Sequence, residues 1–274
     1  MKHTIKNKIL PLRQAAFTLV ELMIAGTLGL LLIAGVIQLF LGSNQNFTLQ
    51  SELADLQEDG RFSLMFLENE IEQAGWYDDN MANPDSLVFT DPVAADRVVN
   101  TDFVSITYQL VSDGTAQDCN GNFVASGLIT NTFYLGGADG EQLICLGNGG
   151  VVGQPLVDGV KDFQVLYGVE SDVACSDGAV NQYMTGDQVL AFNNAAADES
   201  DHLIVVSVRV ALLMASSGNV LNTNESETHY LLDTVRTTND RLAYRTFQQT
   251  IYIPNAFFSR VGDPAGCFAS KVGI

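Results

Sequence analysis

The segment that decides the fold is residues 17–42, which read FTLVELMIAGTLGLLLIAGVIQLFLG. These 26 residues contain a single charged side chain, Glu21. A helix rises about 1.5 Å per residue, so roughly 20 apolar residues cross the hydrocarbon layer of a membrane. The segment is therefore long enough to form a transmembrane helix.

Charges are distributed unevenly around this segment. Residues 1–16 carry Lys2, Lys6, Lys8 and Arg13 and no acidic residue, whereas the rest of the chain has nine basic and 32 acidic side chains. Basic residues before a transmembrane helix favour a cytoplasmic N-terminus, so we expect the acidic remainder on the opposite side of the membrane. An acidic body also repels phosphate backbones, and we expect no nucleic acid bound by the main domain.

The sequence before the apolar segment predicts how the chain is processed. A secretory signal has an apolar core of about 7–15 residues followed by a small-residue cleavage site. Here the apolar segment is longer, and the small pair Ala15-Ala16 precedes it. Cleavage after Ala16 would remove the basic leader and leave Phe17 as the first residue of the mature chain.

Glu21 is the unusual residue of the apolar segment. An ionised carboxylate inside a membrane costs several kcal/mol, so such residues are candidates for function. Two interpretations are open: Glu21 is solvated near the membrane interface, or it awaits a cation inside the membrane. In the second interpretation, the α-ammonium group of Phe17 on one subunit pairs with Glu21 of its neighbour.

Residues 16–25, AFTLVELMIA, closely resemble the N-terminal signature of type IV pilins and type II secretion pseudopilins. The resemblance implies that a prepilin peptidase cuts between Ala16 and Phe17, that Phe17 is then N-methylated, and that Glu21 guides subunit packing and register. In this class the residue before the cut is usually glycine, and here it is Ala16.

The helix is predicted to continue beyond the membrane. Apolar or small residues recur at spacings of three and four, which is one face of a helix; they are Leu49, Leu53, Leu56, Gly60, Leu64, Leu67 and Ile71. Gly75 is a suitable C-cap. We therefore expect one helix over residues 18–74, about 85 Å long at 1.5 Å per residue.

After residue 76 the pattern changes to short β-type segments. Apolar or alternating residues predict strands at 86–90, 103–110, 128–135, 142–146, 162–169, 202–214 and 246–253. Asp-Gly pairs between several of these segments mark turns. The expected fold class is α+β, with a long N-terminal α-helix, transmembrane in its first half, packed on a mostly antiparallel β-sheet head.

These patterns predict four parts of the chain. Residues 1–16 form the cleaved leader, and residues 17–42 form the transmembrane and assembly helix. Residues 43–75 continue that helix and pack on the head, and residues 76–274 form a β-rich periplasmic head.

Several later segments resemble minor pilins of the PilW type, namely residues 60–62, 74–77, 156–169, 208–213 and 245–251. The resemblance implies a low-abundance subunit of the complex that primes pilus assembly, near the tip of the fibre. It implies as partners the prepilin peptidase, the other minor pilins, the major pilin and the inner-membrane assembly platform. It also implies a head that stays in the periplasm until the subunit enters the surface fibre.

The four cysteines all lie beyond the apolar segment, and outside the cytoplasm an even number favours disulfides. Their spacings of 26, 30 and 92 residues fit no zinc site. Among the three possible pairings we favour Cys119–Cys145, which flanks an expected hairpin, together with Cys175–Cys267, which would tie the C-terminus to the head.

Little in the sequence favours an enzyme. Only His202 and His229 lie outside the leader, and we interpret both as surface or capping residues. The chain has no Gly-x-Ser-x-Gly, His-Glu-x-x-His or Gly-x-x-x-x-Gly-Lys motif. We expect no catalytic residue and no cofactor or metal; the oxygen-rich loops around 113–122 and 198–201 are interpreted as solvated turns, with calcium binding as the alternative.

Two other functions remain open from the sequence. A minor pseudopilin of a type II secretion system would have a similar plan. A periplasmic binding domain or enzyme tethered by the helix is the other alternative; it predicts no cleavage before Phe17 and tolerates Glu21→Leu.

Overall fold

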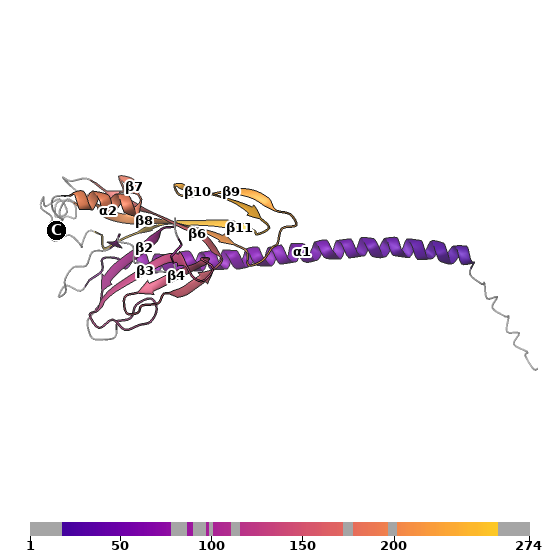
Figure 1. Cartoon of the computed structure of the whole chain (residues 1–274), viewed down its shortest axis with the longest axis horizontal. Coiled ribbons are helices and arrows are strands. Elements are labelled where there is room, and N and C mark those ends of the chain that lie inside the picture. The colour runs from indigo at the N-terminus through magenta and orange to yellow at the C-terminus, as the bar shows by residue number, and fades with distance from the viewer. Residues whose placement is uncertain are drawn as a thin grey trace, which may run out of the picture. The chain divides into compact units, whose positions relative to one another are not determined.

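The computed structural model describes residues 18–77, 87–89, 97–98, 101–110, 116–171, 178–196 and 202–256 (Figure 1). The contacts divide the chain into two units, Met1–Thr48 and Leu49–Ile274. We call the second unit the head and describe each unit by itself. The leader, Phe17, Cys175 and Cys267 lie outside the described residues.

One helix, α1 (Leu19–Ile71), provides residues to both units and is 53 residues long. Within the described residues it is the one helix long and apolar enough to cross a membrane. The expected helix over 18–74 is thereby confirmed to within a turn at its C-terminal end. The C-cap glycine expected there, Gly75, has a φ of 74°, which is the left-handed conformation that glycine adopts readily.

The head contains two antiparallel sheets. The five-stranded sheet has the order β1-β2-β3-β4-β5. Its strands are β1 (Leu87–Val88), β2 (Phe103–Gln109), β3 (Leu128–Gly136), β4 (Gln142–Gly147) and β5 (Gln154–Asp158). The four-stranded sheet has the order β11-β8-β6-β7. Its strands are β6 (Val160–Glu170), β7 (Gln182–Met184), β8 (Ile204–Ala215) and β11 (Tyr244–Tyr252).

A hairpin and a short helix complete the described part of the head. The hairpin pairs β9 (Glu225–Leu231) with β10 (Thr234–Asp240), and the helix is α2 (Gly186–Ala195). Thr185 and Gln188 form a capping box at the start of α2, the Thr-x-x-Gln signal that the sequence analysis did not use. The α+β class and the antiparallel head are confirmed, while β5, β7, β9, β10 and α2 were not expected.

A single residue joins the two sheets. Gly159 lies between β5 and β6 with a φ of 76°, where the Asp158-Gly159 pair predicted a turn. A Cβ at this position would lie 3.0 Å from the carbonyl oxygen of Ala215, so both the backbone conformation and the space favour glycine. The chain therefore changes sheets within one residue.

The C-terminal part of α1 contacts both sheets. Its buried residues follow the predicted helical face and are Leu56, Gly60, Ser63, Leu67 and Ile71. Phe66 packs edge-to-face on Phe133 of β3, with ring centroids 6.0 Å apart. On the other side, Gly60 faces the ring of Phe247 on β11. The helix therefore supplies part of the core of each sheet.

The four-stranded sheet is covered on its second face as well. Ala211 and Leu213 of β8 pack with Leu231 of β9 in a small cluster, while Val210 and Leu212, on the alternate face of the same strand, belong to the main core. Strands buried on both faces read as continuous apolar sequence. This explains why β8 has almost no polar residue, and Figure 1 shows the hairpin beside β8 and β11.

The contact between Gly60 and Phe247 predicts whether an alanine at position 60 stabilises or destabilises the head. Gly→Ala inside a helix ordinarily stabilises it by up to about 1 kcal/mol. A Cβ on Gly60 would lie 2.4 Å from two ring carbons of Phe247, so the ring or the helix must move. We expect Gly60→Ala to lower the free energy of unfolding of the head by roughly 1–3 kcal/mol, measured by denaturant unfolding of the full chain in detergent.

The matched control for this substitution is Gly218→Ala, because a Cβ on Gly218 meets nothing within 4 Å. Adding Phe247→Leu to Gly60→Ala should recover part of the loss, because the smaller side chain leaves room for the methyl group. A Gly60→Ala chain at least as stable as the wild type would contradict the close contact.

Candidate assembly site

The first turn of α1 is capped by a side chain. The Oγ1 atom of Thr18 accepts a hydrogen bond from the backbone N–H of Glu21 at 3.2 Å. Thr18 and Glu21 have the Thr-x-x-Glu spacing of a capping box, a signal that the sequence analysis overlooked. Glu21 also lies in the first turn of the helix, where a negatively charged side chain interacts favourably with the helix dipole.

Glu21 lies among exposed apolar side chains. Its neighbours Leu19, Leu22 and Met23 are 75%, 70% and 61% exposed, and Glu21 is the sole charged residue between positions 18 and 48. An exposed apolar surface of this kind requires either lipid or other protein around it. In such surroundings a carboxylate is costly unless a cation or hydrogen-bond donors face it. Ala16 and Phe17, expected as the processing site, lie outside the described residues.

A disulfide bond joins Cys119 to Cys145 on β4, with their Cα atoms 6.4 Å apart. This is the pair expected from the sequence; the other expected pair, Cys175 with Cys267, lies outside the described residues. Cys119 belongs to a segment before β3, residues 116–124, which we call the disulfide loop. The bond therefore fixes this loop against β4.

Asp118 holds the same loop by accepting backbone hydrogen bonds. Its two carboxylate oxygens accept the N–H groups of Asn120, Asn122 and Gly149, each at 2.9 Å. Asp118 is only 5% exposed. A carboxylate whose oxygens face three N–H donors is occupied structurally. These contacts favour the interpretation of this loop as a turn rather than a calcium site.

Asn131 on β3 joins the disulfide loop to α1. Its Oδ1 atom accepts the backbone N–H of Cys119 at 3.0 Å, and its Nδ2 atom donates to Oε2 of Glu70 at 2.7 Å. Nδ2 also lies 3.4 Å from the hydroxyl oxygen of Tyr108. Burial raises the pKa of Glu70, and the hydrogen bond from Asn131 opposes that shift. No sequence pattern pointed to this chain of contacts.

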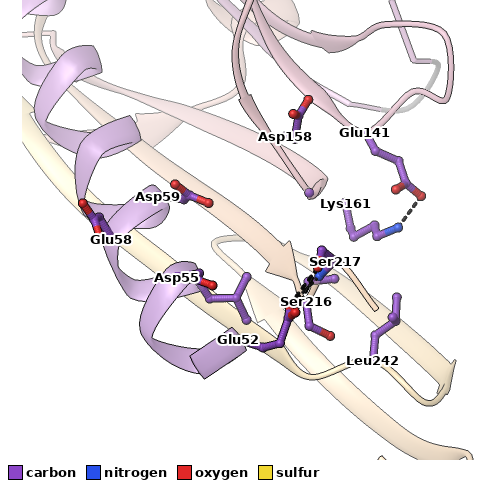
Figure 2. Close-up of a pocket in the computed structure, with 13 residues that line it drawn as sticks. Glu52, Asp55, Glu58, Asp59, Glu141, Asp158, Lys161, Ser216, Ser217 and Leu242 are labelled. Atoms are coloured by element: carbon purple, nitrogen blue, oxygen red, sulfur yellow. Dashed lines mark hydrogen bonds and ion pairs between the residues drawn. The ribbon is translucent and has the colours of Figure 1, made fainter. Parts of the chain in front are cut away.

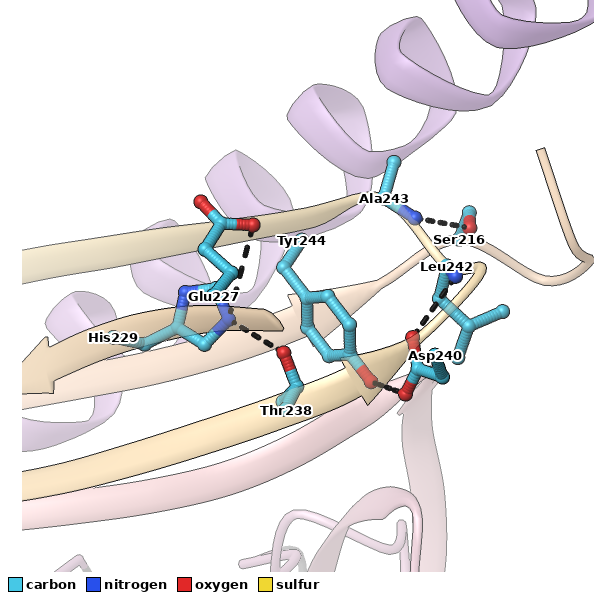
Figure 3. Close-up of polar contacts among 8 residues, drawn as sticks. All are labelled: Ser216, Glu227, His229, Thr238, Asp240, Leu242, Ala243 and Tyr244. Atoms are coloured by element: carbon cyan, nitrogen blue, oxygen red, sulfur yellow. Dashed lines mark hydrogen bonds and ion pairs between the residues drawn. The ribbon is translucent and has the colours of Figure 1, made fainter. Parts of the chain in front are cut away.

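His229 differs from its expected place. We interpreted it as a surface or capping residue, but it is 6% exposed on the inner face of β9, with its ring centroid 5.0 Å from that of Tyr244 (Figure 3). Its Nε2 atom lies 3.1 Å from Oγ1 of Thr238 and 4.0 Å from Glu227. Both partners face the same ring nitrogen, so the three residues do not form a hydroxyl–imidazole–carboxylate relay of the catalytic kind.

A groove of about 540 Å³ lies between α1 and the ends of β5, β6 and β8 (Figure 2). We call it the acidic groove, because its charged lining is Glu52, Asp55, Glu58, Asp59, Glu141, Asp158 and a single lysine, Lys161.

Some of the acids in the acidic groove have protein partners. Glu52 accepts hydrogen bonds from the backbone N–H and hydroxyl of Ser217 at 2.9 and 3.0 Å, and Glu141 forms an ion pair with Lys161. Among the described residues, no group of three or more histidine, cysteine or acidic side chains is arranged to hold a metal ion. Because six acidic side chains share the acidic groove with a single lysine, their negative charges repel one another there.

Comparison with known proteins connects this geometry to a family. Residues 132–255 match the family model described as PilW, Type IV Pilus-assembly protein W. The matched segment runs from within β3 to just beyond β11, so it includes the whole four-stranded sheet, the hairpin and α2.

The match covers a little less than half of the chain, and we call residues 132–255 the PilW domain after the family that they resemble.

This match confirms the resemblance to PilW-type minor pilins that residues of the head had suggested. The N-terminal signature at 16–25 lies outside the matched segment, so the two observations come from different parts of the chain. Together, the PilW domain and the apolar first half of α1 indicate a membrane-anchored pilin.

Other comparisons add little to this result. A type IV-like pilin from Thermus thermophilus is similar to the chain with 12% sequence identity and a TM-score of 0.42, over 73% of this chain and 96% of that one. No curated protein matches the sequence.

The acidic groove generates a pH-dependent prediction. Asp59 is an exposed residue, but partial desolvation in the acidic groove raises its pKa, and the charges of Asp55, Glu58 and Asp158 raise it further. When the pKa of a carboxyl group is higher in the folded than in the unfolded protein, the folded state binds more protons. The protein therefore becomes less stable as the pH rises from the unfolded-state pKa, near 4, through the folded-state pKa. We therefore expect Asp59→Asn to raise the melting temperature at pH 7.5 and low salt, and this gain to disappear below pH 4.

The control is Glu225→Gln at the exposed start of β9, which removes one negative charge outside the acidic groove. Salt should reduce the gain of Asp59→Asn, because the repulsion is partly screened by ions. An equal gain from both variants, or a gain that persists at pH 3.5, would show that repulsion in the acidic groove is not its cause.

Proposed function

We propose that the chain is a minor pilin, a non-enzymatic subunit that helps to start type IV pilus assembly and enters the fibre near its tip. The observation that carries this proposal is the presence of two separate features in one chain. One is the PilW domain at 132–255, and the other is a pilin-type N-terminus at 16–25. A head of this family on a processed apolar helix is the composition expected of a subunit that moves from membrane to fibre.

In this proposal the first half of α1 stores the subunit in the inner membrane, with the head in the periplasm. The prepilin peptidase removes residues 1–16, and Phe17 is N-methylated. The inner-membrane assembly platform then moves the subunit into the fibre, where its helix exchanges lipid for the helices of other minor pilins and of the major pilin. The exposed apolar side chains of Leu19, Leu22 and Met23 are suited to either environment.

Glu21 would set the register of this exchange. A carboxylate in an apolar bundle is strongly disfavoured unless a cation neutralises it. The methylated ammonium group of Phe17 on a neighbouring subunit would supply that cation. The hydrogen bond from the backbone N–H of Glu21 to Thr18 caps the start of the helix, which supports a fixed position of Glu21 in its first turn.

The first experiment is the mass of the N-terminal peptide in membranes from cells with and without prepilin peptidase. We expect a methylated Phe17 peptide in the first strain and an intact leader in the second. An intact leader in both strains would contradict the proposal and favour a domain tethered by its helix. A strain that lacks the gene for this chain gives a second test. If that strain loses protein secretion but keeps its pili, the result would favour the type II secretion alternative.

Substitution of Glu21 tests its role separately. We expect Glu21→Ala to remain in the membrane fraction, because the helix becomes more apolar, and to fall at least about tenfold in sheared pili, since a lost charge pair in an apolar site is worth more than 1.4 kcal/mol. The measurement is a quantitative immunoblot of both fractions.

The matched control in the same helix is Thr27→Ala. The hydroxyl of Thr27 bonds to the carbonyl of Ile24 at 2.9 Å, so it has a partner within its own helix. Wild-type amounts of the Glu21→Ala chain in sheared pili would refute the register role.

A further inference from the structure

A continuous path of contacts leads from the disulfide to the last turns of α1. The bond between Cys119 and Cys145 fixes the disulfide loop on β4. The backbone N–H of Cys119 then donates to Asn131, and the amide group of Asn131 donates to Glu70 of α1. Residues far apart in the sequence are thereby joined through one asparagine side chain.

Asn131 can hold Glu70 only in one orientation. Its side chain is fully buried, and an amide group offers an acceptor at one end and donors at the other. The N–H of Cys119 occupies the acceptor end, which directs the donor end toward Glu70. Without Cys119 in place, the amide oxygen would be buried without this donor, and rotation of the group would bring it against the carboxylate of Glu70.

A second contact between α1 and β3 lies on the same face of the sheet. Phe133 of β3 packs on Phe66, which is one helical turn before Glu70. The cross-strand partner of Phe133 is Cys145 itself. Because directly opposed residues of two strands share a face, the disulfide lies next to the aromatic contact as well as the polar one.

We propose that the Cys119–Cys145 disulfide acts as an oxidation-dependent lock for the end of α1, with Asn131 as the residue that transmits its state to Glu70. In the reduced chain Asp118 still holds the disulfide loop to Gly149, but the covalent tie of Cys119 to β4 is lost. Asn131 then loses its fixed orientation, and α1 separates from β3 over its last two turns. Closure of the bond docks this part of the helix on the head.

The redox step is an ordinary thiol–disulfide exchange. The two cysteine thiols give up two protons and two electrons, and the Sγ–Sγ bond forms. The disulfide of a thiol oxidoreductase accepts the electrons and protons and leaves as a dithiol. Cys119 is half-buried, whereas Cys145 is fully buried, so we expect the exchange to begin at Cys119.

This inference goes beyond the proposed function and does not depend on it. A disulfide that acted solely on the unfolded chain would stabilise all parts of the head that unfold together. The lock instead predicts a local effect, confined to the residues of α1 that contact β3. The two mechanisms can therefore be distinguished by the location of the change.

The test is hydrogen exchange, followed by mass spectrometry, on the full chain in detergent with and without dithiothreitol. We expect amides of residues 64–71 to exchange about tenfold faster in the reduced chain, because local opening of the helix end becomes easier. Residues 49–56 should be unchanged, because Glu52 is held by Ser217 on the other side of the head. Equal protection of 64–71 in both states would overturn the proposal.

Two variants with the disulfide intact separate the lock from general destabilisation. Asn131→Leu removes the transmitting amide, and we expect it to reproduce the faster exchange of 64–71 without a reductant. Its matched control is Asn148→Leu, which removes an asparagine whose side chain bonds the backbone of Leu128 and Thr130 instead of a residue of α1. Reduction of the Asn131→Leu chain should not increase the exchange rate of residues 64–71 any further.

These variants also decide the result if reduction unfolds the whole head. Faster exchange at 64–71 in Asn131→Leu but not in Asn148→Leu supports the lock. Unchanged exchange in Asn131→Leu, or independent and additive effects of reduction and Asn131→Leu, would show that the disulfide does not act on α1 through this side chain.

Discussion

The head depends on the burial of one face of α1. Its buried residues recur every three or four positions from Leu56 to Ile71, and each sheet supplies an aromatic ring to the same helix, Phe133 from β3 and Phe247 from β11. A sheet with one apolar face must cover it with another element. In this chain the element that carries the membrane segment also closes the core, so neither sheet has its full set of core partners without the helix.

The sequence predicted the elements whose apolar pattern is strong. The helical spacing up to Ile71 and the apolar segments of β2, β3, β4, β6, β8 and β11 all have their place in the structure. The hairpin of β9 and β10 could not be found in this way. Its outer face is exposed and its inner face carries polar residues such as His229, so the alternation of apolar and polar residues is absent.

The turn of the same hairpin gave no signal either. Leu231 pairs with Thr234, which leaves Leu232 and Asp233 as a two-residue turn. Such turns usually contain glycine or asparagine because they need a positive φ, and here Leu232 adopts it, at 54°. Surrounding contacts outweigh the local preference, since Leu232 packs on the small cluster of Ala211, Leu213 and Leu231. Tertiary packing of this kind cannot be deduced from the turn sequence.

The candidate sites also differ in whether a local sequence segment is enough to reveal them. Glu21 could be found from the sequence because a lone carboxylate in an apolar segment is conspicuous by itself. The bond between Asn131 and Glu70 joins residues 61 positions apart, and neither residue is unusual in its own segment. The role of Asp118 likewise depends on Gly149, 31 positions later. A candidate site that consists of one residue is therefore visible in the sequence, whereas one that depends on two distant residues requires the fold.

The exit of α1 from the core has a mechanical consequence. Just beyond the helix, Gly75 donates its N–H to the carbonyl of Thr107, and Gln109 donates to the carbonyl of Trp76, so the chain joins β2 as a short ladder. A pulling force on the helix therefore passes directly into the backbone of β2, and from there into the neighbouring strands of the sheet. The load is thereby divided between these two hydrogen bonds and the buried face of the helix itself.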